Sequence, residues 1–264
     1  MSIITLTSDW GSSDFYIAAV KGAILSKLPD TVIVDISHQI KPFDIEGAAF
    51  TVRNSYQSFP KGTVHIVAVN TVETTDHPHI AIQHDGHYFI GTDNGVFSMI
   101  VGDTPEAAVQ IEVYQDSDLF TFSTRDRFVK VAVQLLTGTP LDQLGILRPQ
   151  LTSRLLFEPA ISQDSIKGMV IHIDGYDNAI TNISAELFQQ LRRKRPFEIY
   201  FAGYRLNSLM SSYLDVEVAE LLALFGTHGM LEIAMNQGNA ASLCGLEKYT
   251  PVNVRFINAA ETFV

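Results

Sequence analysis

Hydrophobic and polar positions along the first half of the chain follow the pattern of strands separated by helices. Short apolar runs rich in β-branched residues indicate buried strands, and the residues after the first run have apolar side chains at helical spacing. The predicted elements are a strand at 3–9, a helix at 16–28, a strand at 31–37, a helix at 44–59 and a strand at 62–70. This alternation indicates βαβ units and a mostly parallel sheet flanked by helices.

The pattern changes after this region. Residues 79–95 predict a hairpin with Asp85-Gly86 as its turn. Residues 148–165 are polar, contain two prolines and show no clear period, so we interpret 150–165 as a linker. Short strands separated by turn residues follow at 166–175, 179–184, 197–207, 221–236 and 249–257. The sequence therefore predicts an α/β domain at 1–155 and a smaller, all-β, barrel-like domain at 165–264.

Composition narrows the class of protein. The net charge of the 264 residues is −11, which argues against a nucleic-acid partner because such binding relies on clustered Lys and Arg. The one basic cluster, at 192–196, is typical of a solvated helix end. Cys244 is the single cysteine and suits a reducing compartment. With no uncharged run of about 18 residues, we expect a soluble, cytoplasmic protein without a membrane partner.

Asp9 ends the first predicted strand, and Asp14 lies in the loop that follows it. Ligands of parallel sheets usually bind beyond the carboxyl ends of the strands, where Asp9 and Asn70 fall. For Asp14 the favoured interpretation is a cap on the next helix, a role that Ser12 or Ser13 would serve equally. Asp9 needs a partner at a buried strand end, and a ribose fits because two adjacent hydroxyls can donate to one carboxylate.

Two further segments combine turn residues with ligand-binding chemistry. Residues 172–184 gather Asp and Asn side chains round Gly175, which is typical of a hairpin with Asx-type turns. The functional alternative is a purine site, in which Asn178 bonds the adenine edge and Tyr176 stacks on the ring. Residues 226–242 pack small residues where backbone could approach a ligand closely.

Taken together, these segments resemble one family. The motifs occur in order over nearly the whole chain: SDWGSSDFY, PFDIEGAAF, GTDNGVFS, TFSTRD, IDGYDNAITNI and LEIAMNQGNAAS. The sequence is similar to the S-adenosylmethionine hydrolase (hydroxide adenosyltransferase) family, which includes the fluorinase and the chlorinase. The resemblance implies an N-terminal α/β domain joined to a C-terminal β-barrel. It also implies a homotrimer with S-adenosylmethionine bound between the N-terminal domain of one subunit and the C-terminal domain of its neighbour.

The resemblance also assigns ligand-binding roles. By motif position, Asp9 matches the residue that binds the ribose hydroxyls, and Asp14 and Phe43 match a carboxylate and an aromatic ring of the same pocket. Asp174 matches the residue that binds the methionine ammonium group, and Thr227 and His228 match those that bind the methionine carboxylate. Tyr176, Asn178 and the backbone round Asn239 and Ala241 match the groups that contact the adenine.

At the reaction centre this chain departs from the family pattern. The reaction is displacement at the ribose C5′, for which the hydrolases carry an Asp-Arg-His set. The matching residues here are Asn70, His77 and Ser123. The halogenases carry a tyrosine at the Asn70 position, so their signature is absent too, although Thr124 matches a halide-binding serine of the fluorinase.

Three hypotheses remain. In the first, which we favour, the protein hydrolyses S-adenosylmethionine with Glu73 or His77 as the base. In the second, it binds an adenosyl ligand without turnover. In the third, it transfers the adenosyl group to another nucleophile such as halide. An exposed polar loop is the structural alternative for Glu73, His77 and His79. No metal-ligand spacing or phosphate-binding loop is present, so we expect no metal and no cofactor.

Overall fold

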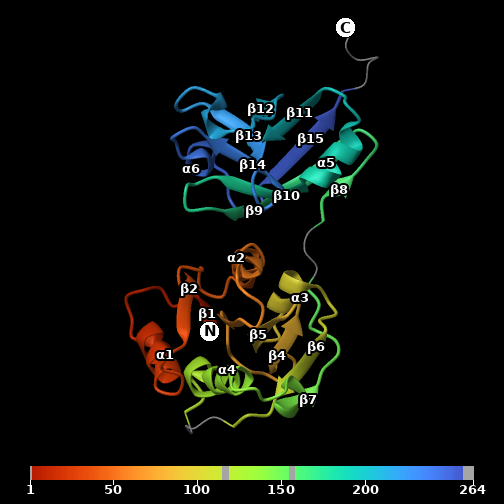
Figure 1. Cartoon of the computed structure of the whole chain (residues 1–264). Helices are drawn as coiled ribbons and strands as arrows, with labels where there is room; N and C mark the ends of the chain where they lie inside the picture. The colour runs from red at the N-terminus through yellow and green to blue at the C-terminus, as the bar shows by residue number, and fades with distance from the viewer. Residues whose placement is uncertain (1, 115–118, 155–157, 258–264) are drawn as a thin grey trace. The chain divides into compact units, whose positions relative to one another are not determined.

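The protein forms two compact units, residues 1–155 and 156–264, in a computed structural model that describes residues 2–114, 119–154 and 158–257 (Figure 1). Residues 155–157 of the predicted linker lie outside the described residues.

The N-terminal unit is built on one seven-stranded sheet with the strand order β2-β1-β3-β5-β4-β6-β7. Its strands are β1 (Ile3–Ser8), β2 (Val32–Ser37), β3 (Val64–Ala68), β4 (His79–His84), β5 (His87–Thr92), β6 (Ala107–Ile111) and β7 (Gly145–Leu147). The first four in spatial order pair in parallel, whereas β4 pairs antiparallel with both β5 and β6, and β7 pairs antiparallel with β6.

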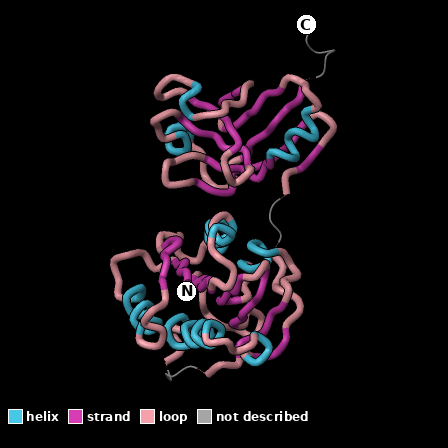
Figure 2. The backbone as a smooth tube through the Cα atoms, in the orientation of Figure 1, coloured by secondary structure: helices cyan, strands magenta, loops and turns pink. Residues whose placement is uncertain are grey.

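Helices cover both faces of this sheet (Figure 2). On one face α1 (Tyr16–Leu25) and α4 (Val129–Leu136) share a buried apolar cluster with Val64 and Ile66 of β3. On the other face α2 (Ile45–Arg53) and α3 (Val96–Val101) share a second cluster with Val67 of the same strand. Because successive strand residues point to opposite faces, a strand covered on both sides reads as a continuous apolar run.

The two predicted helices of this region end earlier than expected. The helix predicted over 44–59 ends at Arg53, because Asn54 Nδ2 and Ser55 Oγ hydrogen-bond back to carbonyl groups one turn earlier and compete with the helix. A 3₁₀ turn, η1 (Tyr56–Ser58), follows it. The helix predicted over 16–28 ends at Leu25. The predicted hairpin is confirmed, since β4 and β5 are joined by Asp85 and Gly86, both with positive φ.

The C-terminal unit is a barrel-like sheet in which every strand pairing is antiparallel, in the order β12-β11-β15-β9-β10-β14-β13 with β8 beside β9. Its strands are β8 (Ala160–Ile161), β9 (Ser165–Ile173), β10 (Ala179–Ser184), β11 (Phe197–Phe201), β12 (Tyr204–Leu206), β13 (Leu221–Phe225), β14 (Met230–Met235) and β15 (Pro251–Phe256). Two helices, α5 (Ala185–Arg192) and α6 (Ala240–Cys244), complete it. The predicted fold class is therefore confirmed for both parts of the chain.

The basic cluster at 192–196 lies at a helix end, as predicted. Helix α5 ends at Arg192, and Arg193 takes a left-handed backbone conformation. The guanidinium groups of Arg192 and Arg195 lie over core aromatic rings, 4.8 Å from the Phe197 centroid and 5.1 Å from the Phe256 centroid. Two of these cations therefore cover the core of the unit.

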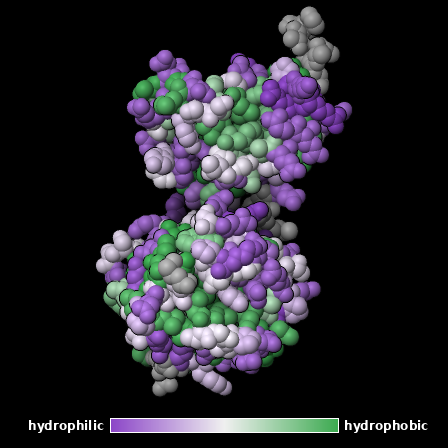
Figure 3. Space-filling view, in the orientation of Figure 1, coloured by the Kyte–Doolittle hydropathy of each residue, from purple (hydrophilic) through white to green (hydrophobic). Residues whose placement is uncertain are grey.

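Among the described residues, no helix is both long enough and apolar enough to cross a membrane. Apolar side chains remain exposed on both units (Figure 3), among them Phe15, Phe120 and Leu214.

Candidate functional site

Asp9 lies in the loop after β1, at the carboxyl end of the parallel strands. The strand end is fixed by its neighbour, because Ser8 pairs in register with Ala68 of β3. Asp9 Oδ2 accepts a hydrogen bond from the Phe43 N–H at 2.9 Å. This bond supplies a partner for a half-buried carboxylate, and it ties the loop after β1 to the turn that contains Phe43.

Phe43 has an unusual backbone conformation. Its φ is 65°, in the left-handed region that bulky residues rarely adopt, and its ring is 71% exposed. Such a conformation persists where neighbouring contacts hold it. The bond from the Phe43 N–H to Asp9 is one such contact, and the next residue, Asp44, is held by capping α2, where its side chain accepts the Gly47 N–H.

The capping interpretation of Asp14 is wrong. Helix α1 begins at Tyr16, its N-cap residue is Phe15, and no side chain caps its first turn. Phe15 instead has a helical backbone conformation, so the chain enters the helix gradually. Asp14 is exposed in the loop before it.

Aromatic rings bring the segment before α4 to the loop after β1. Phe122 meets the Trp10 ring edge-on at a centroid distance of 5.6 Å and the Tyr16 ring at 5.2 Å. Ser123 and Thr124 follow and are buried where a π-helical turn, η2 (Thr124–Phe128), begins. Thr124 Oγ1 has no hydrogen-bond partner among the described residues. Two predicted reaction-centre residues therefore belong to a segment that packs on the loop after β1.

Asn70 follows β3 in a left-handed conformation, with φ 50°, and is exposed. Its backbone oxygen accepts a bond from Asn94 Nδ2 at 3.2 Å, which fixes this turn from the end of β5. A side-chain amide can hydrogen-bond a water molecule but cannot remove its proton.

Glu73 forms an ion pair with an arginine that lies 54 residues away in the sequence. Its Oε2 lies 2.6 Å from Arg127 Nη1, and its Oε1 accepts the His79 backbone N–H at 3.2 Å. Burial acts to raise the pKa of Glu73, but the contacts with His79 and Arg127 outweigh it and lower the pKa below its usual range. A lowered pKa is the opposite of what a general base near neutral pH requires.

His77 is held by a backbone carbonyl. Its Nδ1 lies 3.0 Å from Asp93 O, and because a carbonyl only accepts, Nδ1 carries the proton in the neutral ring. Its backbone N–H also bonds Thr74 Oγ1. In this tautomer Nε2 is left with a lone pair, which is the arrangement that a histidine base requires.

Asp93, which provides that carbonyl, is fully buried. Its carboxylate accepts bonds from Arg148 Nε at 2.9 Å and from the Thr152 N–H at 2.9 and 3.1 Å. One residue therefore holds both His77 and the segment that ends the N-terminal unit.

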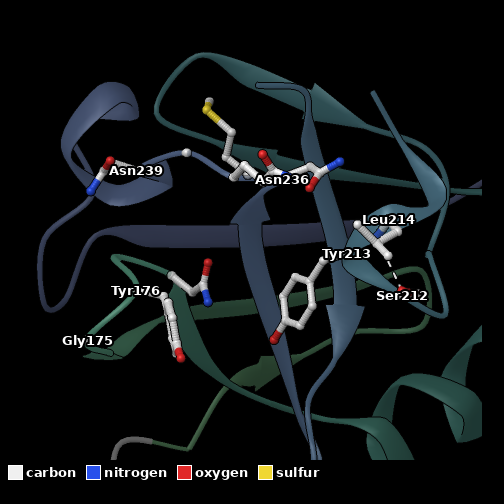
Figure 4. Close-up of a pocket in the computed structure, with 11 residues that line it drawn as sticks. Gly175, Tyr176, Ser212, Tyr213, Leu214, Asn236 and Asn239 are labelled. Carbon is white, nitrogen blue, oxygen red and sulfur yellow. Dashed lines mark hydrogen bonds between the residues drawn. The ribbon is translucent and has the colours of Figure 1, made fainter. Parts of the chain in front are cut away.

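The C-terminal unit contains a cavity of about 810 Å³ (Figure 4). Its walls come from the β9–β10 turn, from the 3₁₀ turn η4 (Tyr213–Asp215) and from the residues that follow β14. They are formed by Gly175, Tyr176, Asn178, Ser212, Tyr213, Leu214, Met235, Asn236, Gln237, Gly238 and Asn239. Three of these were predicted to contact adenine: Tyr176, Asn178 and Asn239.

Asp174 organises the β9–β10 turn. Its Oδ1 accepts the N–H groups of Tyr176 and Asn178, both at 2.9 Å, and its Oδ2 accepts Asn178 Nδ2 at 3.1 Å. This is the Asx-type chemistry that the sequence predicts for the turn. It orients the Asn178 amide, because Nδ2 is committed to the carboxylate.

The same turn is bound to the start of α6. Asp177 accepts the Ala241 N–H on its backbone oxygen at 2.9 Å and the Ser242 N–H on Oδ2 at 2.8 Å. These bonds bring the two predicted adenine-contacting segments together. They also use the Ala241 N–H, which is therefore committed within the protein.

Tyr213 was not predicted, although it lines the cavity. Its hydroxyl donates to Glu232 Oε1 at 2.8 Å, and Glu232 Oε2 lies 3.3 Å from His228 Nε2. Burial and the neighbouring carboxylate raise the pKa of Tyr213 to about 12. The sequence contains a signal for this turn, because Ser212 and Asp215 form a capping box with the spacing S-x-x-D.

Three predicted methionine-binding residues lie outside the cavity walls. Asp174 is used within its own turn, and Thr227 and His228 lie in the turn between β13 and β14. His228 is linked to the cavity through Glu232 and Tyr213, and its Nδ1 accepts the Met230 N–H at 3.0 Å. Within the described ranges, no three His, Cys, Asp or Glu side chains gather as potential metal ligands.

Comparisons with known proteins agree across both units. A family model of the SAM hydroxide adenosyltransferase N-terminal domain matches residues 4–145, and a model of the corresponding C-terminal domain matches residues 168–253. A solved structure of an uncharacterised conserved protein from Thermotoga maritima superposes with a TM-score of 0.85 at 26% identity, covering 97% of this chain and all of that one.

Relatives named as hydrolases of S-adenosylmethionine or as a fluorinase match nearly the full chain. The (R)-S-adenosyl-L-methionine hydrolase of Methanocaldococcus jannaschii is 28% identical over 96% of each chain. The hydrolase of the same name from Thermus thermophilus is 28% identical over 96% of this chain and all of its own. A fluorinase from Nocardia brasiliensis is 24% identical over 96% of each chain.

Proposed function

Because the chain belongs to the SAM hydroxide adenosyltransferase family, we propose that it hydrolyses S-adenosylmethionine to adenosine and methionine. The observation that carries the proposal is the cavity of the C-terminal unit, which combines an exposed tyrosine ring with an oriented amide. Full-length similarity to two S-adenosylmethionine hydrolases supports the same activity.

In this proposal the adenine binds in that cavity. Tyr176 is 82% exposed and offers a ring face for stacking. Since Asn178 Nδ2 bonds Asp174, its Oδ1 is the atom that accepts from the exocyclic amino group of adenine. A purine with a carbonyl at that position would present an acceptor to an acceptor, so adenosyl ligands are favoured over inosyl ligands.

The ribose binds to Asp9. One oxygen of its carboxylate is already oriented by the Phe43 N–H, so the side chain is held in place before the ligand arrives. Two vicinal hydroxyls can then donate to a fixed carboxylate, and such charge-assisted bonds are stronger than neutral ones.

The reaction is displacement at C5′ of the ribose. A water oxygen forms the new bond to C5′ while the C5′–S bond breaks, and the sulfur leaves with the electron pair as neutral methionine. The water proton passes to His77 Nε2, which is the nitrogen with the lone pair in the neutral ring whose Nδ1–H donates to Asp93 O. Because the positive charge of the sulfonium disappears during the reaction, alignment of oxygen, carbon and sulfur contributes much of the rate.

Of the two candidate bases, the contacts favour His77. Glu73 is committed to Arg127 and has a lowered pKa, whereas His77 has the tautomer that exposes a basic nitrogen. Asn70 and Ser123 then act as hydrogen-bonding groups for the water.

Adenosyl transfer to halide is the second candidate, and Thr124 favours it. Its hydroxyl is buried without a partner among the described residues, and it can donate to a halide ion as readily as to a water oxygen. The fluorinase relatives perform such chemistry within the same family.

We propose that the protein acts in the cytoplasm as a homotrimer, with each ligand held by the N-terminal unit of one subunit and the C-terminal unit of its neighbour. The exposed apolar side chains on both units support association. At a limiting concentration of S-adenosylmethionine, mixing Asp9→Ala subunits with Asn178→Ala subunits should then raise the activity above that of either variant alone, because mixed trimers contain sites with neither substitution. A monomer by light scattering, or no restored activity, would overturn this part.

The main test is mass spectrometry of the protein incubated with S-adenosylmethionine in ¹⁸O-labelled water, with and without chloride. Hydrolysis predicts methionine and an adenosine that carries one ¹⁸O at its 5′-hydroxyl in both buffers, and less product with Asp9→Ala when S-adenosylmethionine is limiting. Product that forms only with chloride would establish the halide reaction. Intact S-adenosylmethionine that remains bound would refute both activities and leave a binding protein.

A further inference from the structure

Arg127 joins the two segments that carry the candidate reaction-centre residues. It lies in η2, three residues after Thr124, and its side chain is 15% exposed. Its Nη1 lies 2.6 Å from Glu73 Oε2 and 3.0 Å from His79 Nδ1. The segment between β3 and β4, residues 69–78, is thereby fastened to the helix that begins beside Thr124.

These contacts fix the proton positions of His79. A guanidinium group only donates, so His79 Nδ1 must be the unprotonated nitrogen. Its Nε2–H then donates to Thr71 O at 2.9 Å. Burial is the largest cause that lowers the pKa of His79, and Arg127 acts in the same direction, so the ring stays neutral near pH 7.

The result is a closed loop with His77 inside it. His79 holds Thr71 through its ring and Glu73 through its backbone N–H, while Arg127 holds the free end of Glu73. Within the loop, Thr74 N–H bonds His77 O at 3.1 Å. The segment that carries His77 is therefore held through Glu73 and His79, which both bond Arg127, while the His77 ring itself bonds Asp93 O.

We propose that Arg127 is a positioning residue for the reaction: it holds the segment 71–79 in the shape that presents His77 Nε2 to the water. This inference rests on the proposed function, because Arg127 acts through His77. Lysine cannot replace it fully, since an ammonium group lacks the planar geometry that serves a carboxylate and an imidazole together.

The test compares Arg127→Met with Arg127→Lys by steady-state kinetics and by calorimetric binding of S-adenosylmethionine. Because small displacements of a catalytic group can cost about 100-fold in rate, we expect kcat of Arg127→Met to fall about 10- to 100-fold. Affinity should stay within about twofold, since the binding groups are untouched. Arg127→Lys should recover part of kcat. Lys61→Met is the matched control, because it removes an exposed ion pair with Asp85 on the β4–β5 hairpin.

A second readout does not depend on activity. Imidazole ¹⁵N NMR should show His79 with a proton on Nε2 in the parent protein, and this tautomer should be lost or mixed in Arg127→Met. If the parent protein has no turnover, the proposed function fails, and the NMR result alone decides whether Arg127 fixes the loop. An unchanged kcat in a folded Arg127→Met, or an unchanged His79 tautomer, would overturn the inference.

Discussion

The two units hold their candidate residues by different means. In the N-terminal unit, charged side chains from distant parts of the sequence meet, as Glu73 and Arg127 do across 54 residues. In the C-terminal unit, the cavity is formed by turns whose backbone N–H groups bond carboxylates only a few residues away, as in the Asp174 turn.

This difference separates two tasks. Recognition of a flat, uncharged ring needs a shaped wall and a few oriented amides, which local turn chemistry provides. Moving a proton needs a group whose orientation is fixed by bonds to its other atoms, and His77 obtains this from Asp93. Substitution of the candidate base in the first unit should therefore change turnover, whereas substitutions in the cavity of the second unit should change affinity.

The largest effect is expected on kcat when His77 is replaced. We expect His77→Gln to lower kcat about 10²- to 10⁴-fold, the usual contribution of a general base, with little change in KM. Asn178→Ala should mainly raise KM. Steady-state kinetics would check both, with His84→Gln as a control from the same unit. If His77→Gln raised KM and left kcat unchanged, the division of tasks would be wrong.

Acid should separate the stabilities of the two units. Burial lowers the pKa of His65 to about 3, and the pKa values of His79 and His87 are lowered too, all in the N-terminal unit. For His65 the unfolded chain takes up a proton near pH 6.5 and the folded chain near pH 3, so its stabilising contribution is full above pH 6.5. His65 should cost up to about 1.4 kcal/mol of stability per pH unit as the pH falls through that window, and the lowered pKa values of His79 and His87 act in the same direction.

Trp10 makes this measurable, because it is the single tryptophan and lies in the N-terminal unit. Its fluorescence should report unfolding at a higher pH than the circular dichroism change of the remaining strands. In His65→Gln the fluorescence transition should move to lower pH. Coincident transitions in the parent protein would contradict the prediction.

A smaller effect is expected at Asp9, which serves both a turn and the ligand. Asp9→Ala should weaken binding of S-adenosylmethionine by about 1.5–3 kcal/mol, the contribution of a charge-assisted hydrogen bond. Asp9→Asn keeps an oxygen for the Phe43 N–H and loses only the charge. Calorimetry should therefore rank affinity as parent, then Asn, then Ala. Equal affinity in all three would refute the ribose assignment.

The smallest effects are expected from two tyrosines of the cavity, one acting on ligand affinity and the other on stability. Tyr176 is 82% exposed, so Tyr176→Ala should weaken ligand binding without lowering the melting temperature. Tyr213→Phe leaves Glu232 with one bond fewer and should cost about 1–3 kcal/mol of stability, because an acceptor of a buried carboxylate is left unpaired. Calorimetric titration and thermal melting measure the two. A melting temperature lowered by Tyr176→Ala and not by Tyr213→Phe would reverse the assignment.

Local signals allowed most of the fold to be predicted. The apolar run of β3 covered on both faces and the Asp85-Gly86 turn of the hairpin each depend on neighbouring residues. The end of α2 was missed because it depends on Asn54 and Ser55 side chains that compete for backbone carbonyls. The cap assigned to Asp14 failed because the loop continues through Phe15 before the helix begins.

The candidate site was predictable only in part. Asp9, Tyr176 and Asn178 stand beside strand ends or in turns that the sequence marks. The partner of Glu73 could not be found this way, because an ion pair with Arg127 depends on how two distant segments pack. Tyr213 was missed for a related reason, since its capping box predicts a turn but not that the turn forms a wall of the cavity.

Asp93 has a consequence for how this chain can be re-engineered. Its carboxylate accepts hydrogen bonds from Arg148 and Thr152, and the Arg154 N–H bonds Ser98 Oγ. These bonds attach residues 148–154 to the rest of the N-terminal unit. An insertion after residue 154 would therefore lengthen the connection between the units and leave these hydrogen bonds in place. An insertion just before residue 148 would disturb the bond between Arg148 and Asp93, the residue whose carbonyl group also bonds His77. The position of an insertion, more than its length, should decide whether a redesigned chain keeps its chemistry.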